Sequence, residues 1–178
     1  MTMSNMAIEA GAKCALFTPD EKTAEYCQIE LTDAERSLVG DPDAEYVRTI
    51  HYNAEDFVPV LACPSQVDNI HPVSELIGTS IDQVFIGSCT NGRLSDLKEA
   101  ADILRGKKVA PGLRVIVIPA TPKIYREAME EGLLMDFMNA GCAIMTPCCG
   151  PCIGGSMGIL AAGERALATT NRNFTGRM

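Results

Sequence analysis

Val84-Phe85-Ile86-Gly87-Ser88-Cys89-Thr90-Asn91-Gly92 joins a short apolar run to a turn that contains a cysteine. The apolar run is typical of a buried strand. Apolar residues then recur at helical spacing over residues 94–104, and further apolar runs follow at 113–118 and 143–145, with a helical segment at 122–131 between them. Alternating strands and helices predict right-handed crossovers and a parallel sheet. We therefore predict an α/β fold in three layers, with a mainly parallel sheet and flanking helices.

The N-terminal third of the chain gives weaker signals. Residues 1–10 are similar to the end of a helix, and residues 13–18 predict a strand. Thr18-Pro19-Asp20-Glu21 predicts a helix start, because it offers a capping side chain, a proline and early acidic residues. Residues 46–51 and 58–62 predict two more short strands, and the prolines that follow predict a linker.

The composition excludes several classes of protein. Of the 178 residues, 47% are hydrophobic and 21% are charged, which is typical of a packed globular chain. The formal net charge of −8 argues against non-specific binding to nucleic acid or to an anionic membrane. No apolar run approaches the roughly 20 residues that span a bilayer, and the first residues lack a signal-peptide pattern. We therefore expect a soluble, cytoplasmic protein without nucleic-acid or membrane partners.

Eight cysteines are many for a chain of this length. In a reducing compartment, clustered cysteines bind metal or carry out redox chemistry more often than they form disulfides. Cys89 follows one predicted strand, and Cys149 and Cys152 follow another. Functional loops gather at the carboxyl ends of parallel strands. We therefore expect these three cysteines to lie at the same edge of the sheet.

Cys149-Gly150-Pro151-Cys152 by itself allows three interpretations. It could be a thioredoxin-like redox dithiol, half of a zinc site or part of an iron–sulfur site. The chain has no tryptophan before the motif, and His51 and His71 do not form a spaced pair for zinc. Three thiolates on a four-iron cluster would leave one iron open to act as a Lewis acid. The redox dithiol stays open as an alternative from a different functional class.

Four segments of the chain resemble the aconitase superfamily. They are Met3-Ser4-Asn5-Met6-Ala7-Ile8-Glu9-Ala10-Gly11, Gly87-Ser88-Cys89-Thr90-Asn91-Gly92-Arg93, Cys149-Gly150-Pro151-Cys152-Ile153-Gly154-Gly155 and Asn171-Arg172-Asn173-Phe174-Thr175-Gly176-Arg177. They are most similar to the isopropylmalate dehydratase and homoaconitase large subunits. The resemblance implies an incomplete aconitase-type fold, with the C-terminal part of the family's second domain at residues 1–56 and the N-terminal part of its third domain at residues 57–178.

The resemblance implies a hydro-lyase with a [4Fe-4S] cluster, one iron of which has no cysteine ligand. Such an enzyme dehydrates and rehydrates a hydroxy-di- or tricarboxylic acid; an isopropylmalate dehydratase converts 2-isopropylmalate to 3-isopropylmalate in leucine biosynthesis. The substrates of homoaconitases and of other aconitase-type hydratases stay open as alternatives. The cluster ligands would be Cys89, Cys149 and Cys152, whereas Cys148 has no implied role.

The resemblance also implies roles for residues around the cluster. Asn5 and Glu9 match active-site residues near the cluster and its bound water. Asn171, Arg172 and Arg177 match residues that contact the cluster or the carboxylates of the substrate. Guanidinium groups suit the second task, because they bind carboxylates in bidentate fashion.

Thr90 and Asn91 follow Cys89 directly and allow two interpretations. Their side chains could cap the helix that begins near Leu94. They could instead support a cluster bound at Cys89.

Large subunits of this family are much longer than the present chain. The resemblance places a first domain, with catalytic acidic and histidine residues, before Met1. It places the serine that serves as the catalytic base on a separate small subunit, which we expect to be the partner. We expect the isolated chain to be inactive even with a cluster bound.

Overall fold

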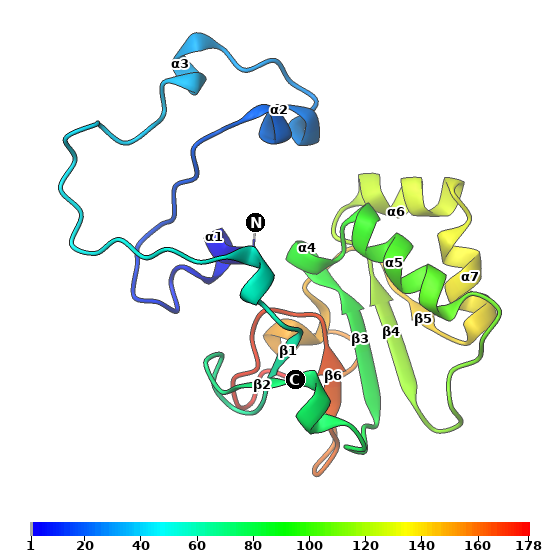
Figure 1. Ribbon diagram of the computed structural model, residues 1–178. Coiled ribbons are helices and arrows are strands. Elements are labelled where there is room, and N and C mark those ends of the chain that lie inside the picture. The colour runs from blue at the N-terminus through cyan, green and yellow to red at the C-terminus, as the bar shows by residue number, and fades with distance from the viewer. Residues whose placement is uncertain (1) are drawn as a thin grey trace. The chain divides into compact units, whose positions relative to one another are not determined.

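The computed structural model describes residues 2–178 (Figure 1). Contacts divide the chain into two compact units, Met3–Val58 and Pro59–Met178, the second of which also includes Thr2. The second unit contains the central sheet and the two strand ends that are followed by Cys89 and by Cys149 and Cys152.

Four parallel strands form the central sheet. Their order across the sheet is β5 (Ala143–Ile144), β4 (Arg114–Ile118), β3 (Gln83–Gly87) and β6 (Ala166–Ala168). β3 pairs with β4 along its whole length and with β6 on its other side. The predicted α/β fold with a parallel sheet is confirmed. β6 was not predicted, because its short Ala-Leu-Ala sequence carries no clear strand pattern.

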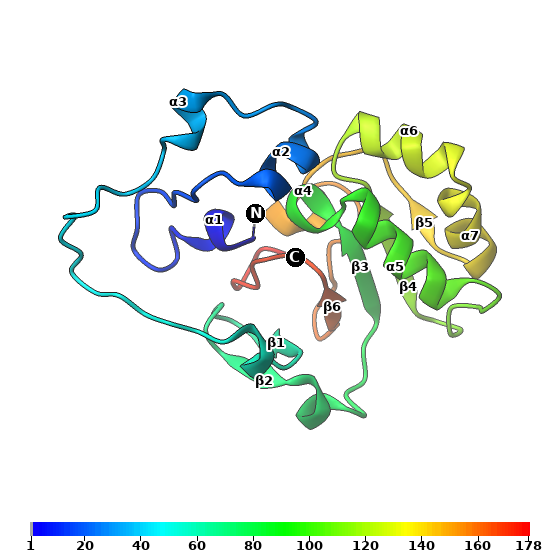
Figure 2. The same ribbon diagram turned by 45° about the horizontal axis from the view of Figure 1, so that its top comes forward.

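Three helices cover one face of this sheet (Figures 1 and 2). They are α5 (Leu94–Leu104), α6 (Pro122–Glu130) and α7 (Leu133–Ala140). Leu97 and Phe137 are fully buried between these helices and the sheet. Burying one such side chain contributes about 1.5–3 kcal/mol to stability, so this layer anchors the strands in place.

The opposite face of the sheet holds a smaller core. Phe85, Ile116 and Ile118 are buried there, and the partly buried side chains packed against them are Met145, Cys152, Ala168 and Met178. This packing holds Cys152 against the sheet.

A hairpin precedes the sheet in the chain. β1 (Val60–Ala62) pairs antiparallel with β2 (Ile70–Pro72), and a 3₁₀ helix, η2 (Val73–Leu76), follows. The strand expected at residues 58–62 is therefore confirmed over three residues. The linker expected from the prolines is wrong, since Pro72 lies in an edge strand, where a missing N–H is tolerated.

Residues 3–58 contain short helices joined by irregular segments. α1 (Thr2–Met6) leads into this unit, and α2 (Glu21–Cys27), α3 (Asp33–Arg36) and the 3₁₀ helix η1 (Ala54–Asp56) follow. No helix within residues 2–178 is long and apolar enough to cross a membrane.

Three local expectations for this unit are wrong. Residues 13–18 and 46–51 are irregular rather than extended strands, because a short apolar run becomes a strand only where a neighbour can pair with it. α2 begins later than expected, since Asp20 rather than Thr18 caps it: the Thr23 N–H donates to the Asp20 carboxylate at 2.8 Å.

Candidate functional site

The chain turns sharply at Gly87, where β3 ends, and the one-turn helix α4 (Ser88–Asn91) that follows carries Cys89. Gly87 and α4 together form the Cys89 turn. Gly87 has φ +116°, and a β-carbon there would collide with the carbonyl oxygen of Ile118 on the neighbouring strand. Ser88 also has a positive φ of 75° and is buried. Its hydroxyl donates to Cys89 Sγ at 3.8 Å. A glycine is therefore needed at position 87 for the Cys89 turn to lie this close to β4.

The second cysteine motif forms a compact turn after β5. The 3₁₀ helix η3 (Gly150–Ile153) follows Cys149. Gly150 has φ +55°, and a β-carbon there would lie 2.5 Å from Ile118 Cδ1. The turn is therefore seated directly on the smaller core of the sheet. Cys152 is half-buried there, whereas Cys149 is exposed.

Hydrogen bonds join the Cys89 turn to the segment after β6. The Gly87 N–H donates to Thr169 Oγ1 at 2.9 Å. Asn91 Nδ2 donates to the Thr169 carbonyl and, at 2.9 Å, to Asn171 Oδ1. The interpretation of Asn91 as the cap of α5 is therefore wrong, and its support of a cluster stays a prediction. Arg93 is the N-cap residue of α5, and the Asn91 amide instead connects the segment around Cys89 to the segment that begins at Asn171.

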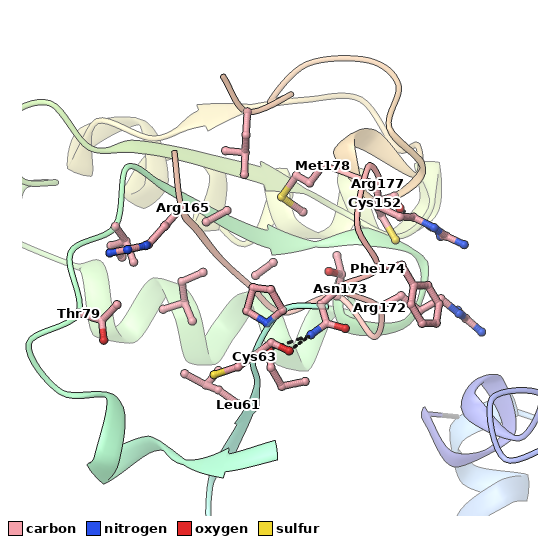
Figure 3. Close-up of a pocket in the computed structure, with 18 of the residues that line it drawn as sticks. Leu61, Cys63, Thr79, Cys152, Arg165, Arg172, Asn173, Phe174, Arg177 and Met178 are labelled. Atoms are coloured by element: carbon pink, nitrogen blue, oxygen red, sulfur yellow. Dashed lines mark hydrogen bonds between the residues drawn. The ribbon is translucent and has the colours of Figure 1, made fainter. Parts of the chain in front are cut away.

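Arg177 lies next to Cys152 (Figure 3). Its Nη1 donates to the Cys152 carbonyl at 3.2 Å, and its guanidinium lies 5.7 Å from the centre of the Phe174 ring. The contact with Phe174 is a cation–π interaction. Two contacts therefore hold this arginine beside the second cysteine motif.

Charged groups from the Cys89 turn, the Cys149–Cys152 turn and the segment after β6 act on the Cys152 thiol. Burial is the largest effect on the Cys152 thiol and raises its pKa. The positive charges of Arg177 and Arg172 lower this pKa, whereas Cys89 and Cys149 raise it further. The structure therefore brings these side chains close enough for their charges to interact. The strand-end argument predicts this for the three cysteines but not for the two arginines.

The chemistry of the cysteine donors fits an iron–sulfur cluster. Among residues 2–178, no three Cys, His, Asp or Glu side chains lie close enough to hold one metal ion. A four-iron cluster makes a different demand, because each thiolate binds a different iron and the sulfurs stand further apart. Cys89, Cys149 and Cys152 are soft thiolate donors of the kind that iron–sulfur clusters require. The residues present therefore fit such a group.

The remaining cysteines of this unit have other surroundings. Cys142 is buried in the core under the helices, and burial raises the pKa of its thiol. Cys148 is exposed. Cys63 is half-buried at the end of β1 and lines a pocket, and no pattern in the sequence predicts this position.

Asn5 and Glu9 belong to the other unit. Asn5 lies in α1, and Glu9 lies in the turns that follow, where its N–H donates to the Met6 carbonyl at 3.1 Å. Their suggested role beside a cluster stays a prediction.

A pocket of about 620 Å³ opens between the hairpin, β6 and the segment after β6 (Figure 3). Its lining is mostly apolar. Cys152, Arg172 and Arg177 contribute to its wall, as does Asn173. The sequence alone indicates no role for Asn173, because nothing in the motif shows what an amide between Arg172 and Phe174 would contact.

Comparisons with known proteins agree on one family. The model of the aconitase family (aconitate hydratase) matches residues 1–80 and 71–178. The chain is 56% identical to the 3-isopropylmalate dehydratase large subunit of Heliobacterium modesticaldum, and 54% identical to that of Nitratidesulfovibrio vulgaris. Both alignments include the whole of this chain but only 42% of the relative, so the chain spans less than half the length of these relatives.

Proposed function

The chain belongs to the aconitase family, and we propose that it supplies the cluster-binding part of a hydro-lyase that interconverts 2-isopropylmalate and 3-isopropylmalate. The reaction removes water from the hydroxy acid and adds it back at the neighbouring carbon. The observation that carries the proposal is that two cysteines, Cys89 and Cys149, and two arginines, Arg172 and Arg177, lie near Cys152, whose carbonyl accepts from Arg177. A homoaconitase, acting on a longer tricarboxylic acid, is the alternative within the same family.

In this proposal Cys89, Cys149 and Cys152 hold a [4Fe-4S] cluster. When bound, the cluster supplies an iron without a cysteine ligand, which acts as a Lewis acid on the substrate's hydroxyl group. The two sharp turns at Gly87 and Gly150 support this assignment, because they fix the cysteine-bearing segments against Ile118 of the same strand. Protein–backbone packing, rather than the cluster alone, then sets where the thiolates lie.

Arg172 and Arg177 would bind the carboxylates of the substrate. A planar guanidinium forms two parallel hydrogen bonds with a carboxylate, which orients the substrate as well as attracting it. The contacts of Arg177 with Phe174 and with the Cys152 carbonyl support this role, because they limit its rotamers before substrate arrives. Asn171, which accepts from Asn91, would contact the cluster from the same segment.

The complete enzyme would need parts beyond these residues. We assign residues 1–56 to the family's second domain and residues 57–178 to its third, with Asn5 and Glu9 reaching the cluster from the second. A small subunit would carry the catalytic base. Because catalysis requires all of these groups in place together, we expect residues 1–178 alone to bind a cluster but not to turn over substrate.

Replacing single cysteines in the full-length large subunit tests the ligand assignment. After anaerobic reconstitution, Cys89→Ser should lose most of its iron and its iron–sulfur absorption, whereas Cys148→Ala should keep both. Loss of the cluster in Cys148→Ala alone would overturn the assignment. A protein that binds no iron but cycles Cys149 and Cys152 between dithiol and disulfide would favour the redox alternative instead.

Replacing the arginines tests the carboxylate contacts. Arg172→Lys and Arg177→Lys keep the positive charge but lose the planar pair of donors. With the small subunit present, each should lower kcat/KM for isopropylmalate at least about tenfold, which corresponds to about 1.4 kcal/mol. Wild-type kinetics in both variants would show that these arginines are ordinary surface cations.

A further inference from the structure

The Asn173 side chain connects the segment after β6 to the β1–β2 hairpin (Figure 3). Its Nδ2 donates to the carbonyl oxygens of Ala62, Cys63 and Gln66, at 3.1, 2.6 and 3.1 Å. These carbonyls lie more than a hundred residues away in sequence, at the start of the turn between β1 and β2. One amide group therefore holds two distant segments together.

The three carbonyls make this position selective for a neutral donor. A carboxylate of the same shape would place negative charge against three acceptor oxygens and could donate to none of them. Asn173 Oδ1 is buried and has no hydrogen-bond partner among the described residues. The hydrogen bonds that this side chain makes in the structure are thus all directed to the hairpin turn.

The neighbours of Asn173 are the residues that the proposed function uses. Arg172 precedes it directly, and Phe174, whose ring contacts Arg177, follows it. The Arg177 N–H also donates to the Phe174 carbonyl at 3.2 Å. In Figure 3 Asn173 points toward Cys63, whereas Arg172 and Arg177 point away from the hairpin. Fixing residue 173 therefore fixes the backbone from which both guanidinium groups extend.

We propose that Asn173 is a positioning residue: by holding residues 172–177 against the β1–β2 turn, it sets where Arg172 and Arg177 meet a substrate carboxylate. The proposal rests on the proposed function for its kinetic consequence but not for its structural one. The β1–β2 turn lies in the stretch where the sequence predicts a linker, and in this proposal it is the fixed structure against which the arginine segment is placed.

Asn69 provides a matched control for Asn173. Its Nδ2 donates to the carbonyls of Cys63 and Pro64, at 3.3 and 3.0 Å. It therefore stabilises the same turn from within the hairpin, and none of its hydrogen bonds in the described structure reaches residues 171–177. Asn69→Asp weakens the turn, whereas Asn173→Asp weakens the turn and releases the arginine segment.

Alkylation of cysteines in residues 1–178, without cluster, tests the connection itself. Peptide mapping after timed treatment with N-ethylmaleimide reports Cys63 on the hairpin side and Cys152 on the other. Asn173→Asp should raise the labelling rate of both thiols several-fold, whereas Asn69→Asp should raise that of Cys63 only. Unchanged Cys152 labelling in Asn173→Asp, or an equal rise in both variants, would overturn the proposal. Asn173→Ala repeats the test without an added charge if the Asp variant fails to fold.

Kinetics of the full-length enzyme with its small subunit test the consequence. Asn173→Asp and Asn173→Ala should lower kcat/KM at least about tenfold, mostly through KM, with the iron content of the wild type. Asn69→Asp should stay within about twofold of the wild type. Equal kinetic losses in the Asn69 and Asn173 variants would reduce Asn173 to a general stabiliser and overturn the proposal. If the wild type itself does not act on isopropylmalate, the proposed function fails, and the alkylation result still decides the connection.

Discussion

Residues 3–58 and residues 59–178 begin their helices by the same local rules but differ in what those helices bury. Asp20 and Thr32 form capping boxes at α2 and α3, much as Thr121 caps α6. Neither α2 nor α3 has a buried residue, and among residues 3–58, all of which are described, Leu31 alone is a buried hydrophobic. α5, α6 and α7 contribute most of the core under the sheet.

The difference shows that a capped helix contributes little to stability unless it is packed against a core. A capping side chain contributes about 1 kcal/mol, and isolated helices of this length are marginal in water. In residues 3–58 large apolar side chains such as Leu16, at 92% exposure, remain in solvent. Cooperative stability therefore belongs to residues 59–178, which also carry the cysteine and arginine motifs.

The two units should differ most in the loss of unfolding free energy when a phenylalanine in each is replaced by alanine. Phe137 is fully buried in α7, and Phe137→Ala should lower the free energy of unfolding by about 3–5 kcal/mol. Phe57 is 66% exposed and touches the Tyr52 ring, so Phe57→Ala should cost less than about 1 kcal/mol. Urea unfolding followed by circular dichroism measures both. Similar costs would show that residues 3–58 have a core of their own.

The second-largest difference in stability between the two units is expected when a glycine in each is replaced by alanine. In Gly87→Ala the new β-carbon meets the Ile118 carbonyl oxygen at a positive φ, so the cost should be about 2–4 kcal/mol. Gly11 has φ +83° but no neighbour within 4 Å, so Gly11→Ala carries only the backbone cost of about 1–2 kcal/mol. In thermal unfolding, only Gly87→Ala should shift the main transition by more than a few degrees. The comparison fails if Gly11→Ala shifts it equally.

Removing a helix cap should have a smaller and more local effect. Thr121 Oγ1 accepts from the Ile124 N–H at 3.2 Å, and Thr121→Ala should destabilise residues 59–178 by about 1 kcal/mol. Asp20→Ala removes an equivalent bond from α2. It should lower the helical signal slightly and leave the unfolding midpoint unchanged, because α2 is not attached to a core. A matching shift of the midpoint in Asp20→Ala would contradict this view.

The two units should differ least in how a single carboxylate changes the stability of the protein at low pH. Hydrogen bonds from Arg114, and then from the Ala161 N–H, lower the pKa of Glu164 from 4.5 to about 2. A carboxylate with a lowered folded-state pKa stabilises the fold above its unfolded pKa of 4.5, and this contribution is lost as the pH falls toward 2. Glu164→Gln should therefore make urea midpoints less sensitive to pH between 4.5 and 2.

Glu35 is the matched control for that measurement. The Thr32 backbone N–H and then its hydroxyl lower the pKa of Glu35, but both residues lie in the unit without a core. Glu35→Gln should leave the pH dependence of the main transition unchanged. An equal change in both variants would mean that the two units unfold together.

The sequence by itself determined the parallel sheet and the residues at its carboxyl edge. β3 and β4 were predictable because short apolar runs rich in Val and Ile are local patterns typical of buried strands. The cysteines follow those runs directly, so their meeting at one edge follows from topology. β6 and the failed strands at residues 13–18 and 46–51 were not predictable, because short runs become strands only when a partner is present.

Only the tertiary structure decided how the motifs are connected. Asn91 could have capped a helix, and its amide instead reaches Thr169 and Asn171. Asn173 gave no signal at all, and its contacts lie in the distant hairpin turn. A side-chain amide can donate a hydrogen bond to any carbonyl within reach. The sequence therefore identifies the donor but does not predict which carbonyl accepts. Packing of the sheet brings the acceptors within reach, and that packing depends on the whole of residues 59–178.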